Sequence, residues 1–422
     1  AVETGGWKME IIQGDLEYGF TTREKVSFNY TMKNTFTAVA IALLFYSCTD
    51  PNAVYNEGLE LFEKKQYLDA LAQFRRAADA GSGAAMNQLG QMYENGNGVT
   101  QDYEVAMQWY KKGADAGSKA ALNNIGWMYE KGEGVDVNYE EAMNWYKKAA
   151  DAGNEVASNN IGWLYEHGYG VTKDYRKAME WYKKAAKAGS GVAMNNIGFM
   201  YETGTGVDTN YQEAMKWYQE AAALDVEDAV FNIGYMYEKG LGVDIDYDKA
   251  MALYQRSAKK GNYRAMNNIG WMYHKGMGVE KDSAKAIEWY TKSAEAGYNI
   301  GMYNVGHFYA QSEFGNNDYE KALHWYKKAA AAGSYEAMNN IAWMYEKGNG
   351  VERDFDAAFE WYQKAANGGN SAAMNNLGWM FEKGLGRPQD HALAKEWYQK
   401  AVAAESTEAV DNLESLNKKK KK

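Results

Sequence analysis

Apolar and polar positions recur along the chain with a period of 36 residues. The stretch from Ala121 to Val156 reads ALNNIGWMYEKGEGVDVNYEEAMNWYKKAADAGNEV. Close copies of it begin at Ala85, Ala157, Ala193, Ala229, Ala265, Gly301, Ala337 and Ala373. We number the repeats one to nine from Ala85, and the positions within each repeat 1 to 36. A constant period of about 20 to 50 residues is typical of solenoids and other repeat arrays.

The first half of each repeat predicts an amphipathic helix. In repeat two, positions 1, 5, 8 and 9 form an apolar stripe at helical spacing: Ala121, Ile125, Met128 and Tyr129. Gly132 at position 12 suits the left-handed residue that ends a helix. A second glycine at position 14 then predicts an irregular connection.

The second half of each repeat predicts another helix. Position 18 is Asp or Asn in every repeat: Asp102, Asn138, Asp174, Asn210, Asp246, Asp282, Asp318, Asp354 and Asp390. A short acceptor side chain at this point should cap the first amide groups of a helix. The following apolar face in repeat two consists of Ala142, Met143, Trp145, Tyr146 and Ala149. Gly153 should end this helix, so each repeat is expected to form a helical hairpin.

One hairpin cannot bury both stripes alone, so the hairpins are expected to stack and share a continuous core. Tyr occupies position 26 in every repeat, and Trp occupies position 25 in all but one, where Leu253 stands. Burying one aromatic side chain removes about 150–250 Å² from water. These aromatics are therefore interpreted as core residues, and Ala at position 22 and Gly at position 6 should allow close helix packing.

These residues resemble the Sel-1-like repeat, a relative of the tetratricopeptide repeat. The matching features are Leu/Ile-Gly at positions 5–6, Tyr at 9, Gly-x-Gly-Val at 12–15, Ala at 22, Trp-Tyr at 25–26 and Ala-Ala at 29–30. The resemblance covers residues 85–408. It implies an all-α fold, a right-handed α-solenoid of stacked hairpins, that serves as an adaptor or scaffold for other proteins. Ser312, Phe314 and Gly315 in repeat seven depart from the loop pattern, which predicts a local irregularity there.

The flanking segments differ from the repeat. Residues 53–84 predict a shorter hairpin without the Gly-x-Gly connection, which resembles a tetratricopeptide repeat. Residues 409–417 repeat the first-helix stripe and should form a capping helix, and residues 418–422 are a poly-Lys tail. Residues 1–31 match no repeat and are interpreted as an upstream or disordered segment.

Residues 32–48 are typical of an export signal. A short basic start precedes an apolar run from Phe36 to Tyr46, followed by Ser47 and Cys48. Three interpretations stand: a lipoprotein signal with Cys48 as the lipidated residue, a simple secretory signal, or an uncleaved apolar segment without a targeting role. The first two predict an exported protein, either periplasmic or anchored to a membrane by lipid. Because the chain has one Cys, no disulfide can form within it.

Charge and motifs argue against several function classes. A net charge of −10 disfavours nucleic acid as the main partner. The five His lack the spacing of a zinc site, and Asp244, Asp246 and Asp248 begin a calcium-loop pattern that Lys249 and Gln255 then break. The Gly-x-Gly pairs follow helices rather than strands. We therefore predict no cofactor, no metal and no enzymatic activity. The alternatives are an envelope-associated enzyme or cell-wall-active protein, and a purely architectural spacer.

The candidate binding surface lies opposite the apolar stripe of the first helix. The resemblance implies that positions 3, 7, 10 and 11 line a concave groove that takes a protein or peptide. The candidate groove residues are Asn123, Trp127, Asn159, Trp163, Asn195, Phe199, Phe231, Tyr235, Asn267, Trp271, Tyr303, His307, Asn339, Trp343, Asn375 and Trp379. Asn amides can pair with a peptide backbone, and aromatic rings are frequent interface hot spots. Alternatively, the position-7 rings pack between adjacent first helices.

Two further positions carry separate expectations. Asn at position 4 is expected to make structural hydrogen bonds to a neighbouring backbone. Glu at position 10 is expected to be solvated or paired with Lys at position 11. Repeats five to seven break the pattern together, with Phe231, Tyr235, His274, Tyr303 and His307. This divergence predicts where a specific partner would engage.

Overall fold

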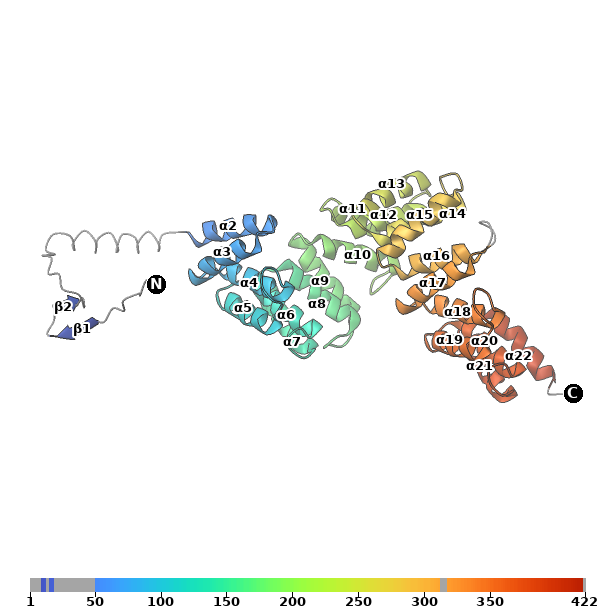
Figure 1. Ribbon diagram of the computed structural model, residues 1–422. Coiled ribbons are helices and arrows are strands. Elements are labelled where there is room, and N and C mark those ends of the chain that lie inside the picture. Colours follow the sequence, from blue (N-terminus) through green and yellow to red (C-terminus); the bar gives the residue numbers. More distant parts are fainter. Residues whose placement is uncertain (1–8, 13–14, 19–49, 312–316, 420–422) are drawn as a thin grey trace. The chain divides into compact units, whose positions relative to one another are not determined.

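The computed structural model describes residues 9–12, 15–18, 50–311 and 317–419 (Figure 1). Strands β1 (Met9–Ile12) and β2 (Asp15–Tyr18) pair antiparallel, an arrangement that the sequence pattern did not predict. The remaining described residues contain 21 helices. The predicted export signal at residues 32–48, with Cys48, lies outside the described residues, and so do residues 312–316, where a local irregularity was predicted.

Every repeat contains the two predicted helices. The first helices are α4 (Gly83–Asn95), α6 (Lys119–Lys131), α8 (Glu155–His167), α10 (Gly191–Thr203), α12 (Glu227–Lys239), α14 (Tyr263–Lys275), α16 (Asn299–Ala310), α18 (Tyr335–Lys347) and α20 (Ser371–Lys383). The second helices are α5 (Tyr103–Asp115), α7 (Tyr139–Asp151), α9 (Tyr175–Lys187), α11 (Tyr211–Ala222), α13 (Tyr247–Lys259), α15 (Ser283–Glu295), α17 (Tyr319–Ala331), α19 (Phe355–Asn367) and α21 (His391–Ala403). Helices α2 (Pro51–Glu63) and α3 (Tyr67–Asp79) precede them, and α22 (Thr407–Lys419) follows.

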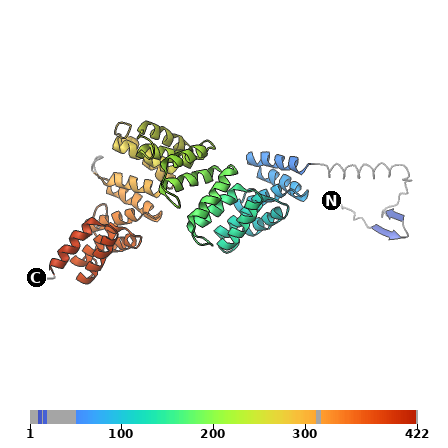
Figure 2. The same cartoon turned by 180° about the vertical axis from the view of Figure 1, so that it is seen from behind.

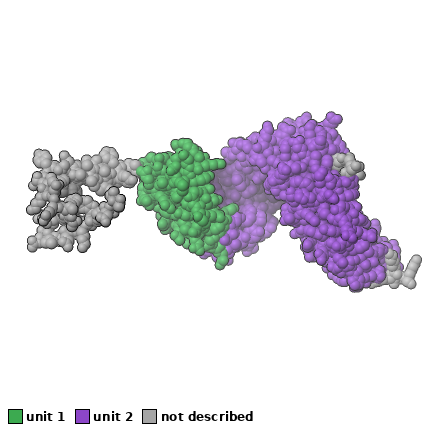
Figure 3. Space-filling model, in the orientation of Figure 1, with its two compact units in different colours: residues 1–128, 133–136 green, residues 129–132, 137–422 purple. Residues whose placement is uncertain are grey.

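The chain divides into two compact units (Figure 3). One covers residues 1–128 and 133–136, and the other covers residues 129–132 and 137–422. Within each unit, helices pack mainly on the helices next to them in sequence, which can be followed from both sides (Figures 1 and 2). Contacts between neighbouring repeats define a solenoid of stacked hairpins, so the predicted all-α repeat fold is confirmed.

The predicted helix ends are also confirmed. The side chain at position 18 accepts a backbone N–H at the start of the second helix in all nine repeats. Asp174, for example, accepts from the amides of Arg176 and Lys177 at 3.1 and 3.0 Å. These bonds lower the pKa of Asp174, the Lys177 amide contributing most. Gly168 ends α8 at φ 75°, a left-handed conformation that costs glycine little.

The core is built around the tyrosine at position 26. These nine side chains are at most 2% exposed: Tyr110, Tyr146, Tyr182, Tyr218, Tyr254, Tyr290, Tyr326, Tyr362 and Tyr398. Gly at position 6 makes room for the ring, because a Cβ at Gly270 would lie 2.7 Å from a ring carbon of Tyr290. Gly at position 14 does the same between repeats, since a Cβ at Gly242 would lie 2.6 Å from the Cβ of Tyr211.

Trp at position 25 lies at the edge of this core. It is half-buried, and a lysine one helical turn later covers its ring in seven repeats. The Lys148 Nζ lies 3.8 Å from the ring centroid of Trp145. Such cation–π contacts are worth about 0.5–1 kcal/mol at exposed sites.

Within the described part of the chain, none of the helices has the length and apolar character needed to cross a lipid bilayer.

Candidate functional site

The candidate site is the first-helix face, which we define as positions 3, 4, 7, 10 and 11 of the first helices. Its polar positions turn out to be connected to the core and to neighbouring repeats. Which of its side chains are available to a partner depends on those connections.

The glutamates at position 10 reach into the core. In seven repeats the Tyr hydroxyl at position 26 donates a hydrogen bond to this carboxylate. The pairs are Tyr110–Glu94, Tyr146–Glu130, Tyr182–Glu166, Tyr218–Glu202, Tyr254–Glu238, Tyr362–Glu346 and Tyr398–Glu382. The distances between the hydroxyl and carboxylate oxygens are 2.6–3.0 Å in six of these pairs, and the oxygens of Tyr110 and Glu94 lie closer. Four of these glutamates, among them Glu238 at 3% exposure, are buried rather than solvated.

Lysine at position 11 completes this contact in four repeats. The ion pairs are Lys131–Glu130, Lys239–Glu238, Lys347–Glu346 and Lys383–Glu382, at 2.6–3.0 Å. The alternative expectation, pairing with Lys, is therefore confirmed at these positions. Where position 11 is Asn95 or Thr203, burial raises the pKa of Glu94 and of Glu202. Each carboxylate binds a tyrosine hydroxyl and thus has a structural role.

The asparagines at positions 3 and 4 form a ladder between repeats. The position-4 amide nitrogen donates to the position-3 amide oxygen of the preceding repeat at 2.8–3.2 Å. The donor–acceptor pairs are Asn124 to Asn87, Asn196 to Asn159, Asn232 to Asn195, Asn304 to Asn267, Asn376 to Asn339 and Asn412 to Asn375. Position 4 is therefore structural, as expected, but its partner is a side chain rather than backbone.

The ladder reduces what position 3 can offer a partner. Asn375 is 5% exposed and Phe231 8%, while Asn123, Asn159, Asn195, Asn267, Tyr303 and Asn339 are partly buried. Because several of these amide oxygens already accept a ladder bond, position 3 is mainly a structural position. Its role in binding stays a prediction.

The rings at position 7 are the most accessible part of the face. Trp127, Trp271 and Trp343 are each 39% exposed, and Phe199 is 46% exposed. The remaining candidates at this position, which are Trp163, Tyr235, His307 and Trp379, are partly buried. A lysine from the preceding repeat approaches two of them: Lys131 lies 5.9 Å from the centroid of Trp163 and Lys347 lies 5.8 Å from that of Trp379.

Repeats five to seven each depart from this pattern, first at the ladder and then at the position-10 carboxylate. In repeat five, Phe231 replaces the ladder Asn. Its ring is tilted against that of Tyr254, with the centroids 5.5 Å apart, and its centroid lies 4.6 Å from the Arg264 guanidinium. Asn268 instead donates to the Tyr254 hydroxyl at 3.1 Å.

In repeats six and seven, the position-10 carboxylate is absent. In repeat six His274 takes its place, its Nδ1 3.5 Å from the Tyr290 hydroxyl. Repeat seven has Ala310 there. Tyr303 stands at the ladder position of that repeat and stacks 5.8 Å from His307.

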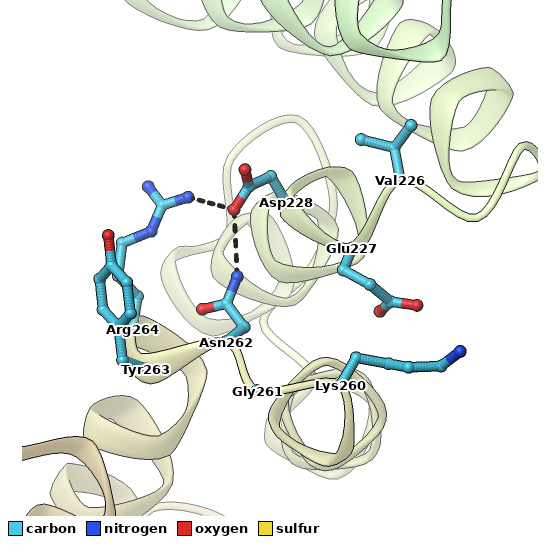
Figure 4. A pocket seen from close by; sticks show the side chains of 8 residues that line it. All are labelled: Val226, Glu227, Asp228, Lys260, Gly261, Asn262, Tyr263 and Arg264. Atoms are coloured by element: carbon cyan, nitrogen blue, oxygen red, sulfur yellow. Dashed lines mark hydrogen bonds and ion pairs between the residues drawn. The ribbon is translucent and has the colours of Figure 1, made fainter. Parts of the chain in front are cut away.

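A shallow pocket of about 320 Å³ lies beside the first turn of α12 (Figure 4). Its charged groups are largely occupied, because Asp228 accepts from Arg264 at 2.7 Å and from Asn262 at 3.1 Å. A buried carboxylate oxygen of Glu227 has no hydrogen-bond partner among the described residues. Those residues also contain no cluster of His, Cys, Asp and Glu suited to a metal ion.

Arg264 was not among the predicted site residues. The signal in the sequence is that position 36 carries opposite charges in consecutive repeats, Asp228 in repeat four and Arg264 in repeat five, on either side of the one Phe at position 3.

Comparison with known proteins agrees with this geometry. The Sel1 repeat model matches residues 83–118, 119–154, 156–190, 191–226, 227–262, 264–298, 300–334, 336–370 and 371–406. This chain belongs to the Sel1 repeat family, so the resemblance inferred from its motifs is confirmed. No curated protein sequence matches the chain.

Two solved structures are similar over long stretches. A protective antigen of uropathogenic Escherichia coli with an SLR fold is 34% identical, with 88% of each chain covered and a TM-score of 0.50. A Sel1 repeat protein from Oxalobacter formigenes is 37% identical over 58% of this chain and 99% of its own, with a TM-score of 0.53. Sel1 repeat proteins generally mediate protein–protein interactions and are typically non-catalytic scaffolds.

Proposed function

We propose that this protein is a non-enzymatic scaffold that holds a protein or peptide along its first-helix face. The observation that carries the proposal is the row of half-exposed rings at position 7. Exposing a large aromatic ring to water is unfavourable, and such rings are frequent binding hot spots. A purely architectural spacer would have no need of them.

The occupied carboxylates support a scaffold rather than an enzyme. A catalytic acid–base pair needs two titratable groups held in different environments around a reacting centre. Here each buried glutamate is bound to a tyrosine hydroxyl of its own repeat, as Glu346 is to Tyr362 at 2.8 Å. The same arrangement recurs along the chain, which is expected of a structural role.

The proposal is tested by affinity capture from a native extract with the full chain. The variant replaces Trp127, Trp163, Trp271 and Trp343 with Ala. A matched control replaces four exposed aliphatic side chains away from the first-helix face, Leu68, Leu224, Ile245 and Leu393, with Ala. We expect the tryptophan variant to lose its captured proteins, because each hot-spot ring contributes about 2 kcal/mol or more. Equal capture by both variants would count against the proposal.

Export and lipid anchoring are proposed separately, from the sequence of residues 32–48. The proposal predicts that Cys48 carries the lipid. Metabolic labelling with a fatty-acid analogue should modify the wild-type chain and not a Cys48→Ala variant. Labelling of both chains, or of neither, would argue against it.

A further inference from the structure

Repeats six and seven have lost negative charge on the first-helix face. Position 10 carries a carboxylate in the other seven repeats, whereas His274 and Ala310 occupy it here. The hairpins are intact nonetheless, since Tyr290 and Tyr326 are only 2% exposed. Two acidic groups are thus missing from a stretch whose fold does not depend on them.

The cationic side chain of this stretch is retained. Lys275 at position 11 is exposed, and its Nζ lies 4.6 Å from the ring centroid of Trp271. In a regular repeat this lysine would pair with the glutamate beside it, as Lys347 pairs with Glu346 at 2.6 Å. In repeat six the neighbouring residue is His274 instead.

A second histidine stands at the equivalent ring position of the next repeat. The lysine at position 11 approaches the position-7 ring of the next repeat in two regular cases, Lys131 with Trp163 and Lys347 with Trp379. The position-7 ring that follows Lys275 is His307, which stacks against Tyr303 and whose Nε2 lies 2.7 Å from the side-chain nitrogen of Gln311. We call Trp271, His274, Lys275, Tyr303 and His307 the divergent patch.

Two acidic groups among the described residues near the patch, Glu238 and Glu336, are already engaged. Glu238, on the preceding first helix, binds Tyr254 and Lys239 at 2.7 and 2.6 Å. Glu336, in the first turn of the following one, accepts from the Ser334 hydroxyl at 3.1 Å. Burial is the main cause that raises the pKa of Tyr303, and the negative charge of Glu336 raises it further.

We propose that the divergent patch binds carboxylate side chains of an extended segment of a partner protein, with its rings holding apolar side chains beside them. This rests on the proposed function and names the chemistry of its ligand. Charge complementarity is the reason: the cationic Lys275 lies beside the Trp271 ring in the stretch where two carboxylates of the regular repeat are replaced, and partial desolvation there strengthens a charge-assisted hydrogen bond. The chain's net charge of −10 disfavours a polyphosphate backbone as the source of the negative charge.

The test uses a phage-displayed library of random dodecapeptides, selected on the immobilised full chain. We expect selected peptides to be enriched in Asp and Glu relative to the library. Converting those residues of the best binder to Asn and Gln should weaken binding about tenfold, within the range measured for hydrogen bonds to charged groups. The H274E/A310E variant, which restores the regular carboxylates and gives Tyr290 and Tyr326 their acceptor, should weaken binding of the acidic peptide similarly.

A matched control separates local from general charge effects. His324 is exposed on the second helix of repeat seven, so H324E adds a negative charge of the same kind away from the patch. This control should bind the acidic peptide within about twofold of wild type. Thermal unfolding by circular dichroism should show that H274E/A310E is no less stable than wild type.

The outcomes distinguish the two proposals. Peptides without acidic residues, or equal losses in H274E/A310E and H324E, would overturn the inference and leave the proposed function standing. A selection that enriches no peptide on the wild-type chain would contradict both.

Discussion

Repeats six and seven fold in the same way as repeats eight and nine. The two pairs differ in how their buried polar groups are hydrogen-bonded. In repeats eight and nine, Tyr362 donates to the buried Glu346 at 2.8 Å, and Asn376 donates to Asn339 at 3.2 Å. In repeats six and seven, Ala310 replaces the glutamate that would accept from Tyr326. Both tyrosines are nevertheless at most 2% exposed. The apolar stack therefore defines the fold, and the polar connections add stability that a repeat can give up when its surface takes on another task.

The largest difference between the two regions should come from removing the tyrosine hydroxyl. Tyr362→Phe leaves the carboxylate of Glu346 buried without its tyrosine donor and should lower the free energy of unfolding by about 1–3 kcal/mol. Tyr326→Phe leaves no carboxylate without a donor and should lower the free energy of unfolding by less than about 1 kcal/mol. Urea denaturation, with hydrogen exchange in α17 and α19 as a local measure, compares them. Equal losses of unfolding free energy in the two variants would mean that the hydrogen bond to the glutamate adds nothing to stability.

The asparagine ladder should have a smaller effect. Asn376→Ala removes one inter-repeat hydrogen bond and should lower the free energy of unfolding by about 1 kcal/mol. A double-mutant cycle with Asn339→Ala isolates the bond itself, because these two side chains contact each other directly. A coupling energy near zero would show that the ladder is present without stabilising the stack.

The smallest effect concerns glutamates without a lysine partner, and it depends on pH. Burial raises the pKa of Glu202 above its usual 4.5, so the folded state binds a proton at higher pH than the unfolded state does. The contribution of this site to stability is thus fully present below about pH 4.5 and is lost as the pH rises through the folded pKa. Glu202→Gln should therefore stabilise the protein by about 0.5 kcal/mol at neutral pH and leave it unchanged at pH 4.

The matched variant is Glu346→Gln, which separates Lys347 from its ion-pair partner at 2.6 Å. It should lower stability at neutral pH, the opposite sign. Thermal midpoints of both variants at neutral and acidic pH give the comparison. The same sign for both at neutral pH would show that the lysine does not compensate for the buried charge.

Much of the fold could be predicted because it depends on neighbours in sequence. The cap at Asp174, the left-handed Gly168 and the buried Tyr182 follow from helical periodicity within one repeat. The polar connections were harder, because a helical wheel shows which face a residue occupies and not what the adjacent helix brings to it. Glu166 lies on the polar face of its own helix but meets Tyr182 from the next.

The ladder depends on how consecutive repeats align. Asn196 and Asn159 are 37 positions apart, so their contact reflects the register between hairpins rather than the geometry of either one. The recurrence of Asn pairs at positions 3 and 4 was visible in the sequence, and it was interpreted partly as a binding surface. Only the packed structure shows that the two positions bind each other.

Hydrogen exchange with and without the best selected peptide tests the central claim most directly. If the first-helix face of the divergent patch is the binding surface, exchange should slow in α14 and α16 while α15 and α17 exchange as before. Protection confined to the second helices, or none despite saturating peptide, would contradict it.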